Sequence, residues 1–77
     1  MDNKTLIREN EIEDDLVSKI YHTEDKIILE ICYNSGKFMI IKNYPKNPSG
    51  EKSCEDFLDK IKSVDDIFDY FKIKRRK

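Results

Sequence analysis

Apolar side chains recur at steps of three and four residues through the last third of the chain, and this stripe constrains the fold most. At 100° per residue it occupies one continuous half of a helical wheel, as in a helix with one buried face. Its members are Cys54, Phe57, Leu58, Ile61, Val64, Ile67, Phe68 and Phe71. We predict one long helix over about residues 54 to 73, with Ser53 as its N-cap. Because Ser63 and Asp66 repeat the capping pattern, two shorter helices with a break near Lys62 are the alternative.

The segment from Leu16 to Tyr44 alternates between β-forming runs and turn-forming clusters. The runs LVSKIYH, KIILEICY and KFMIIKNY are separated by TED and NSG, and they predict a three-stranded antiparallel meander. A turn centred on the acidic pair of TED makes Lys19 face Glu30. The same register makes Ile20 face Leu29, so a charge pair and an apolar pair both favour it. The following YPKNPSGEKS, with two prolines and a glycine, predicts a loop that ends the sheet.

The third strand has two possible registers. One face of the predicted sheet carries the larger apolar set, which is Leu16, Ile20, Ile27, Leu29, Ile31 and Tyr33. A two-residue turn places Phe38 and Ile40 on this face. A three-residue loop with Gly36 in a left-handed bulge places Met39 and Ile41 there instead. Both registers remain open on the sequence alone.

The first 15 residues have the weakest pattern, because Leu6, Ile7 and Ile12 are their only apolar residues after the first methionine and charges surround them. A partly ordered acidic arm, an edge strand and a short helix are all compatible with this pattern. The simplest assembly lays the long helix across one face of the three-stranded sheet. The predicted fold class is therefore a single small α+β domain of residues 1–77.

Both faces of the predicted sheet carry apolar side chains, and one helix covers only one face. The other face then holds Val17, Tyr21, Ile28 and Cys32. Monomers rarely expose large contiguous apolar patches, so we expect the N-terminal segment, another protein or a second copy of the chain to cover this one. An uncovered edge strand would offer a further docking site through strand addition.

Charge and hydropathy exclude several classes of function. Fifteen Lys and Arg and sixteen Asp and Glu leave a net charge of -1, which argues against disorder and against a dedicated nucleic-acid binder. No apolar run approaches the roughly 20 residues of a bilayer span, and the N-terminus has no apolar signal-peptide core. We expect a cytoplasmic protein in which Cys32 and Cys54 are reduced.

Residues that could carry chemistry are few and scattered. Cys32, Cys54 and His22 are the only soft metal ligands, and their spacing is not that of a zinc site. A thiol on an apolar face lacks the electropositive surroundings that lower its pKa. We therefore expect no enzymatic activity, no cofactor and no metal. A walled cavity lined by His22 and either thiol would contradict this expectation.

The first functional hypothesis is a small non-enzymatic module that binds another protein, with homodimerisation as a further possibility. Short, charge-dense chains of this kind are typical of accessory inhibitors that phages and other mobile elements direct at a host protein. Acidic side chains would steer the module toward a basic partner surface. The candidate protein-binding residues are Glu11, Glu13, Asp14, Asp15 and Tyr21.

The alternative hypothesis is nucleic-acid binding by the basic end of the chain, with Lys42 and Lys46 as further contacts. Cations at this position also suit the negative end of a helix dipole, so a solvated helix end is the simpler interpretation. The candidate nucleic-acid-binding residues are Lys72, Lys74, Arg75, Arg76 and Lys77.

Overall fold

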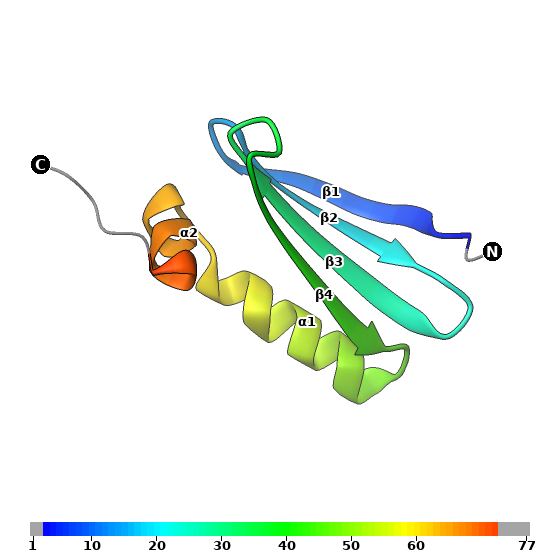
Figure 1. Cartoon of the computed structure of the whole chain (residues 1–77). Coiled ribbons are helices and arrows are strands. Elements are labelled where there is room, and N and C mark those ends of the chain that lie inside the picture. The colour runs from blue at the N-terminus through cyan, green and yellow to red at the C-terminus, as the bar shows by residue number, and fades with distance from the viewer. Residues whose placement is uncertain (1–2, 73–77) are drawn as a thin grey trace, which may run out of the picture.

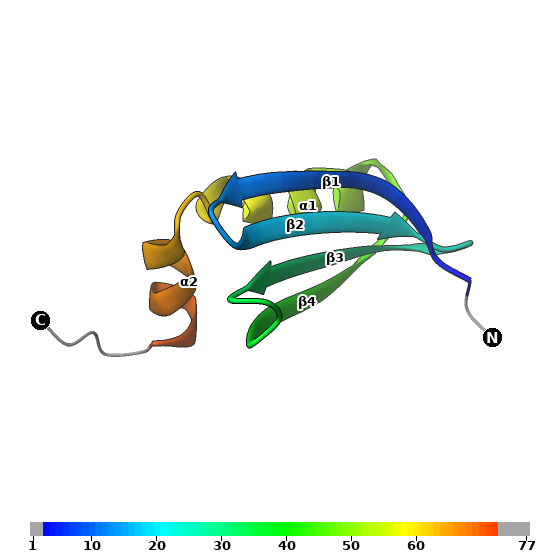
Figure 2. The same cartoon turned by 90° about the horizontal axis from the view of Figure 1, so that it is seen from above.

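The computed structural model describes residues 3–72 and has an α+β fold, as predicted. Four strands form one antiparallel sheet in the order β1-β2-β3-β4, so β1 and β4 are its edges. Helix α1 runs along one face of the sheet, and α2 lies at the end where the β1–β2 and β3–β4 turns are found (Figures 1 and 2). The elements are β1 (Thr5–Glu13), β2 (Leu16–His22), β3 (Lys26–Tyr33), β4 (Phe38–Pro45), α1 (Pro48–Lys60) and α2 (Val64–Phe71).

Strand β1 is the main correction to the predicted sheet, which had three strands. It pairs with β2, and its register shifts between Leu6 and Arg8 and again between Glu11 and Glu13. Each bulge adds one unpaired residue and so interrupts the alternation of side chains between the two faces. The edge-strand alternative for the N-terminal segment is therefore confirmed, and the segment extends the sheet instead of folding over its second face.

The predicted pairing of β2 with β3 is confirmed. Lys19 is opposite Glu30, and Ile20 is opposite Leu29. The turn is held by buried Thr23, whose hydroxyl accepts a hydrogen bond from the Lys26 backbone N–H at 3.1 Å. The local pattern of charges and turn residues was thus sufficient to predict this hairpin.

The β3–β4 hairpin has the register and the faces of the predicted two-residue turn, and its loop runs from Asn34 to Lys37. The Lys37 backbone N–H donates to the Asn34 carbonyl oxygen at 3.1 Å, and the two central residues, Ser35 and Gly36, have φ of 56° and 89°. Positive φ at both central positions is what a type I′ hairpin turn requires. Phe38 consequently faces the helices, and so does Ile40, which is buried.

Helix α1 begins earlier than predicted. Its N-cap is Asn47, whose side chain accepts a hydrogen bond from the Gly50 backbone N–H at 2.7 Å, and Pro48 occupies the first helical position. The predicted N-cap Ser53 lies inside the helix, and the second half of the predicted loop is helical. A Cβ atom at Gly50 would lie 1.8 Å from the Pro45 carbonyl oxygen, so only glycine fits where the chain turns back from β4.

The prediction of one long helix is wrong, and the two-helix alternative is correct. Ser63 is the N-cap of α2, and its side chain accepts from the Asp66 backbone N–H at 3.4 Å. A second acceptor comes from far away in the sequence, because the Glu13 carboxylate accepts from the Val64 backbone N–H at 2.8 Å. The break lets α2 turn across the end of the sheet.

The core fills the space between the helices and one face of the sheet. At the end covered by α2 the rings of Tyr33, Phe38 and Phe68 lie with their centroids 6.0 to 6.2 Å apart. The buried apolar residues are Leu16, Ile20, Ile27, Leu29, Ile31, Ile40, Cys54, Ile61 and Ile67.

Candidate functional site

The face of the sheet opposite the helices, hereafter the open face, carries a second apolar set. The strand pairings place residues of all four strands on it. Within residues 3–72 no helix or loop covers this face (Figures 1 and 2). Met39 and Ile41 are 43% and 55% exposed, and Leu6 is 47% exposed. The apolar side chains of the open face are Leu6, Val17, Tyr21, Ile28, Cys32, Met39 and Ile41.

One end of the open face is electrostatically neutralised. The Lys4 ammonium lies 2.9 Å from the Glu30 carboxylate and 4.3 Å from the centre of the Tyr21 ring. The hydrogen bond with Glu30 raises the pKa of Lys4. The candidate residue Tyr21 is therefore half-buried beneath a cation that is already paired.

The other end of the open face is a shallow hollow of about 170 Å³ beside the two turns. Val17 and Cys32, which are paired across β2 and β3, contribute its apolar part, and Glu9 and Asp15 contribute carboxylates. Burial raises the pKa of the Cys32 thiol, and the nearby Glu30 charge adds to the effect. The hollow thus combines a neutral apolar floor with acidic side chains, and we call it the acidic end of the open face.

The predicted acidic cluster is only partly brought together. Glu11 lies on the open face opposite Val17, and Asp15, at φ 63° in the β1–β2 turn, lines the hollow. Asp14 is an exposed turn residue. Glu13 points away and caps α2, so its role in the structure is to stabilise the fold.

Sequence reasoning missed Glu9, which lines the same hollow and is opposite Lys19 in the β1–β2 register. The signal that could have found it is the charge pairing itself. A β1 strand aligned so that Glu9 meets Lys19 extends the row in which Lys19 meets Glu30. Without evidence that residues 5–13 form a strand, that alignment had no basis.

The residues of the basic hypothesis do not form a patch in the described part of the chain. Lys72 is the C-cap of α2 with φ 57°, and residues 74–77 lie outside the described residues. The Lys42 ammonium lies over two aromatic rings of the helices, 5.0 and 5.6 Å from their centres. The Lys46 ammonium donates to a backbone carbonyl in the β2–β3 turn at 3.1 Å. Lys42 and Lys46 therefore have partners within the fold.

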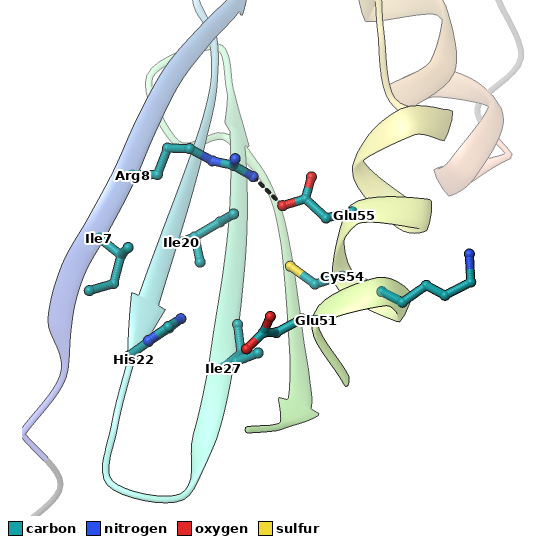
Figure 3. Close-up of a pocket in the computed structure, with 9 residues that line it drawn as sticks. Ile7, Arg8, Ile20, His22, Ile27, Glu51, Cys54 and Glu55 are labelled. Carbon is teal, nitrogen blue, oxygen red and sulfur yellow. Dashed lines mark hydrogen bonds and ion pairs between the residues drawn. The ribbon is translucent and has the colours of Figure 1, made fainter. Parts of the chain in front are cut away.

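On the helix side, a groove of about 400 Å³ runs between β1, β2 and the first half of α1 (Figure 3). Ile20, Ile27 and Cys54 form its apolar floor. Arg8 of β1 forms an ion pair with Glu55 of α1, with 2.6 Å between a guanidinium nitrogen and a carboxylate oxygen. The groove is therefore bridged by one ion pair where β1 comes close to α1.

His22 and Cys54 both line this groove, which is the combination that would support thiol chemistry. The groove is open to solvent on one side. Burial raises the pKa of the Cys54 thiol, the neighbouring Glu55 charge raises it further, and Arg8 only partly offsets the two effects. A nucleophilic thiol needs a lowered pKa, so these surroundings favour an inert core cysteine.

The described residues, 3–72, do not bring the soft ligands together. Cys32 and Cys54 lie on opposite faces of the sheet, so His22 shares a groove with only one of them. No group of three or more His, Cys, Asp or Glu within these residues could hold a metal ion. In the same part of the chain, neither helix has the length and apolar character needed to cross a membrane.

The chain was compared with known proteins in three ways. No protein-family model, no curated protein and no solved structure matches it. The function proposed below therefore depends on the geometry of this chain alone.

Proposed function

We propose that the chain is a small non-catalytic protein-interaction module whose open face binds another protein. The observation that carries this proposal is a set of apolar side chains on the open face, contributed by all four strands, that no helix or loop of residues 3–72 covers. Such a surface on a small soluble fold typically marks a binding site. A partner that covered it would also remove apolar area from water, with about 25 cal/mol gained per Å².

The charges at the acidic end favour one kind of partner surface. Glu9 and Asp15 line the hollow together with the cation Lys19, and Glu11 is opposite Val17 of its apolar floor. A partner that presents apolar side chains flanked by Lys or Arg would match both the floor and the carboxylates. The excess of carboxylates would mainly increase the association rate with a basic surface.

The rigidity of the sheet supports the same function. Strands β2, β3 and β4 pair without a register shift, so the apolar side chains are held in fixed rows. Little conformational entropy would be lost when such a surface binds. A preformed surface is therefore a better docking site than a loop of the same composition.

The proposal can be tested by removing charge from the acidic end. In the double variant Glu11→Gln/Asp15→Asn, two carboxylates are lost, and asparagine tolerates the left-handed backbone at position 15. The matched control Glu24→Gln/Asp59→Asn removes the same charge from exposed residues outside the acidic end. Each purified protein is used to capture partners from a lysate of the source organism, and binding to the purified partner is then measured.

We expect the wild type and the control to bind the partner alike and the Glu11/Asp15 variant to bind at least about tenfold more slowly at low salt. The difference should shrink at high salt, because the charges are then screened. Backbone amide shifts of Val17, Tyr21 and Cys32 should change on binding. Equal binding by both variants, unshifted open-face amides or the absence of any captured protein would overturn the proposal.

A further inference from the structure

Strand β4 offers a free hydrogen-bonding edge. The Lys46 backbone N–H donates to the Asp25 carbonyl oxygen, and in the β3–β4 register this bond directs the N–H and C=O groups of Ile40 and Lys42 toward β3. The alternate residues Met39, Ile41 and Asn43 therefore direct theirs outward. Within residues 3–72 no strand lies beyond β4.

Exposed apolar side chains flank this edge on both sides. Met39 and Ile41 lie on the open face. On the helix side, the Phe71 ring lies 5.7 Å from Phe38 of β4, and the Tyr70 ring lies under the ammonium of Lys42. These four are among the six exposed large hydrophobic side chains of residues 3–72. An edge strand with apolar groups above and below can bind another strand with both hydrogen bonds and apolar contact.

We propose that a second copy of the chain pairs antiparallel with β4, so that the two four-stranded sheets join into one. Closed two-fold pairing is the commonest form of homo-oligomer, and an antiparallel edge is self-complementary. In antiparallel pairing with the outward groups of Met39, Ile41 and Asn43 bonded, the two-fold axis passes beside one residue of β4. An axis at Ile41 pairs residues 38–44 of each copy, which uses nearly all of the strand.

The side-chain contacts favour the axis at Ile41. Each Ile41 then meets Ile41 of the second copy on the open face, and the two residues exchange both of their backbone hydrogen bonds. On the helix side Phe38 meets Tyr44 of the second copy, and Ile40 meets Lys42 of the second copy. An axis at Lys42 would instead place two ammonium groups opposite each other, which is destabilising.

This pairing uses the backbone edge of β4, whereas the docking proposed above uses the side chains of the open face, of which only those of β4 would take part in both. The two activities are compatible. The open faces of the two copies would become one continuous surface, with an acidic end contributed by each copy.

Two matched variants test the pairing. Ile41→Lys places ammonium groups opposite each other at the axis, whereas Ile7→Lys makes the same change at an equally exposed isoleucine of β1, 54% against 55%. We expect light scattering and sedimentation to show twice the mass of one chain for the wild type and for Ile7→Lys. Ile41→Lys should weaken dimerisation by at least about tenfold.

Mixing two charge variants tests the axis itself. Because the axis pairs position 41 with itself, Ile41→Lys and Ile41→Glu should each dimerise poorly but form a mixed dimer, visible as a distinct mass by native mass spectrometry. If the mixture yields no more mixed dimer than chance pairing predicts, the axis at Ile41 is wrong.

A third variant tests the backbone. Asn43→Pro removes an outward N–H that β3 does not use, and proline is tolerated on such an edge. Asn43→Ala removes the same side chain and keeps the N–H. We expect only the proline variant to lose dimerisation, with its circular dichroism unchanged.

Wild-type chains that stay monomeric at the highest soluble concentration would overturn the inference, and so would a dimer that survives both Ile41→Lys and Asn43→Pro. A monomer that binds an extended segment of another protein at β4 would be the same edge with a different occupant, and would also overturn it. None of these outcomes bears on the Glu11/Asp15 experiment, so the two proposals can fail separately.

Discussion

The two edge strands of the sheet differ in their charge and in the regularity of their pairing. β1 carries four charged residues among nine, and its register against β2 shifts twice. β4 carries one charged residue, Lys42, and pairs with β3 without a shift. Charges and bulges are devices by which natural sheets prevent edge-to-edge association. The comparison indicates that this chain blocks one edge and leaves the other available.

The two edges are also attached to the helices in different ways. β1 makes polar contacts with them, through the Arg8–Glu55 ion pair and the Glu13 carboxylate at the start of α2. β4 makes apolar contacts, through buried Ile40 and the ring of Phe38. β4 is therefore part of the core, whereas β1 contributes only half-buried Ile12 to it.

The largest expected effect is on stability and tests that difference directly. Ile40→Ala, at a side chain only 3% exposed, should lower the free energy of unfolding by about 3 kcal/mol, because it leaves a cavity in the core. Ile7→Ala on β1 should change it by less than about 0.5 kcal/mol. Urea denaturation at one fixed protein concentration measures both. Similar losses for the two variants would mean that β1 is as much a part of the core as β4.

A smaller effect is expected where β1 meets α2. Glu13→Ala should cost about 1 kcal/mol, the usual value for a lost helix cap, because the Val64 N–H loses its acceptor. Glu11→Ala is the matched control, since Glu11 lies on the open face and should change stability little. Hydrogen exchange of the Val64 amide should become faster only in the Glu13 variant. Unchanged exchange there would show that Ser63 alone is a sufficient cap.

The Arg8–Glu55 ion pair should contribute still less. Its side chains are 43% and 56% exposed, so solvent screens the attraction, and we expect a coupling of about 0.5 kcal/mol. The measurement is a double-mutant cycle of Arg8→Met and Glu55→Gln at low and high salt. A coupling that persists at high salt would mean that the pair is more shielded, and β1 more firmly attached, than its exposure indicates.

The smallest effects concern the two thiols. Burial raises both pKa values, so alkylation of each should be slower than in a free peptide and should still rise with pH above about 8.5, the ordinary thiol value. Half-buried Cys32, next to Met39 of β4, should react faster than buried Cys54, as peptide mapping after brief labelling can show.

The raised thiol pKa values also predict the direction in which stability changes with pH. Above about pH 8.5 the unfolded chain loses its thiol protons before the folded chain does, so stability should fall as pH rises. Below about pH 8.5 the thiols are protonated in both the folded and the unfolded chain, so their ionisation should not change the stability. A rise in stability above this pH would contradict the assignment of both cysteines as buried neutral groups.

Much of the sheet could be predicted because its signals are local. The turn cluster TED and the pairing of Lys19 with Glu30 belong to one hairpin, and together they specify the β2–β3 register. β1 could not be predicted, because its bulges remove the alternation by which a strand is found. The acidic end of the open face was predicted only in part for the same reason, since Glu9 and Glu11 acquire their places from the register of β1.

By itself, the sequence determined that strands β2 to β4 form a meander, that an apolar helical stripe covers one face, and that apolar side chains remain on the other. Only the tertiary structure decided whether the helix breaks at the second capping pattern. The stripe runs on without interruption because α1 and α2 face one core, with Ile61 and Ile67 both buried. The cap from Glu13 reaches the start of α2 across 51 positions of sequence, and a contact of that range appears only once the sheet has brought the two segments together.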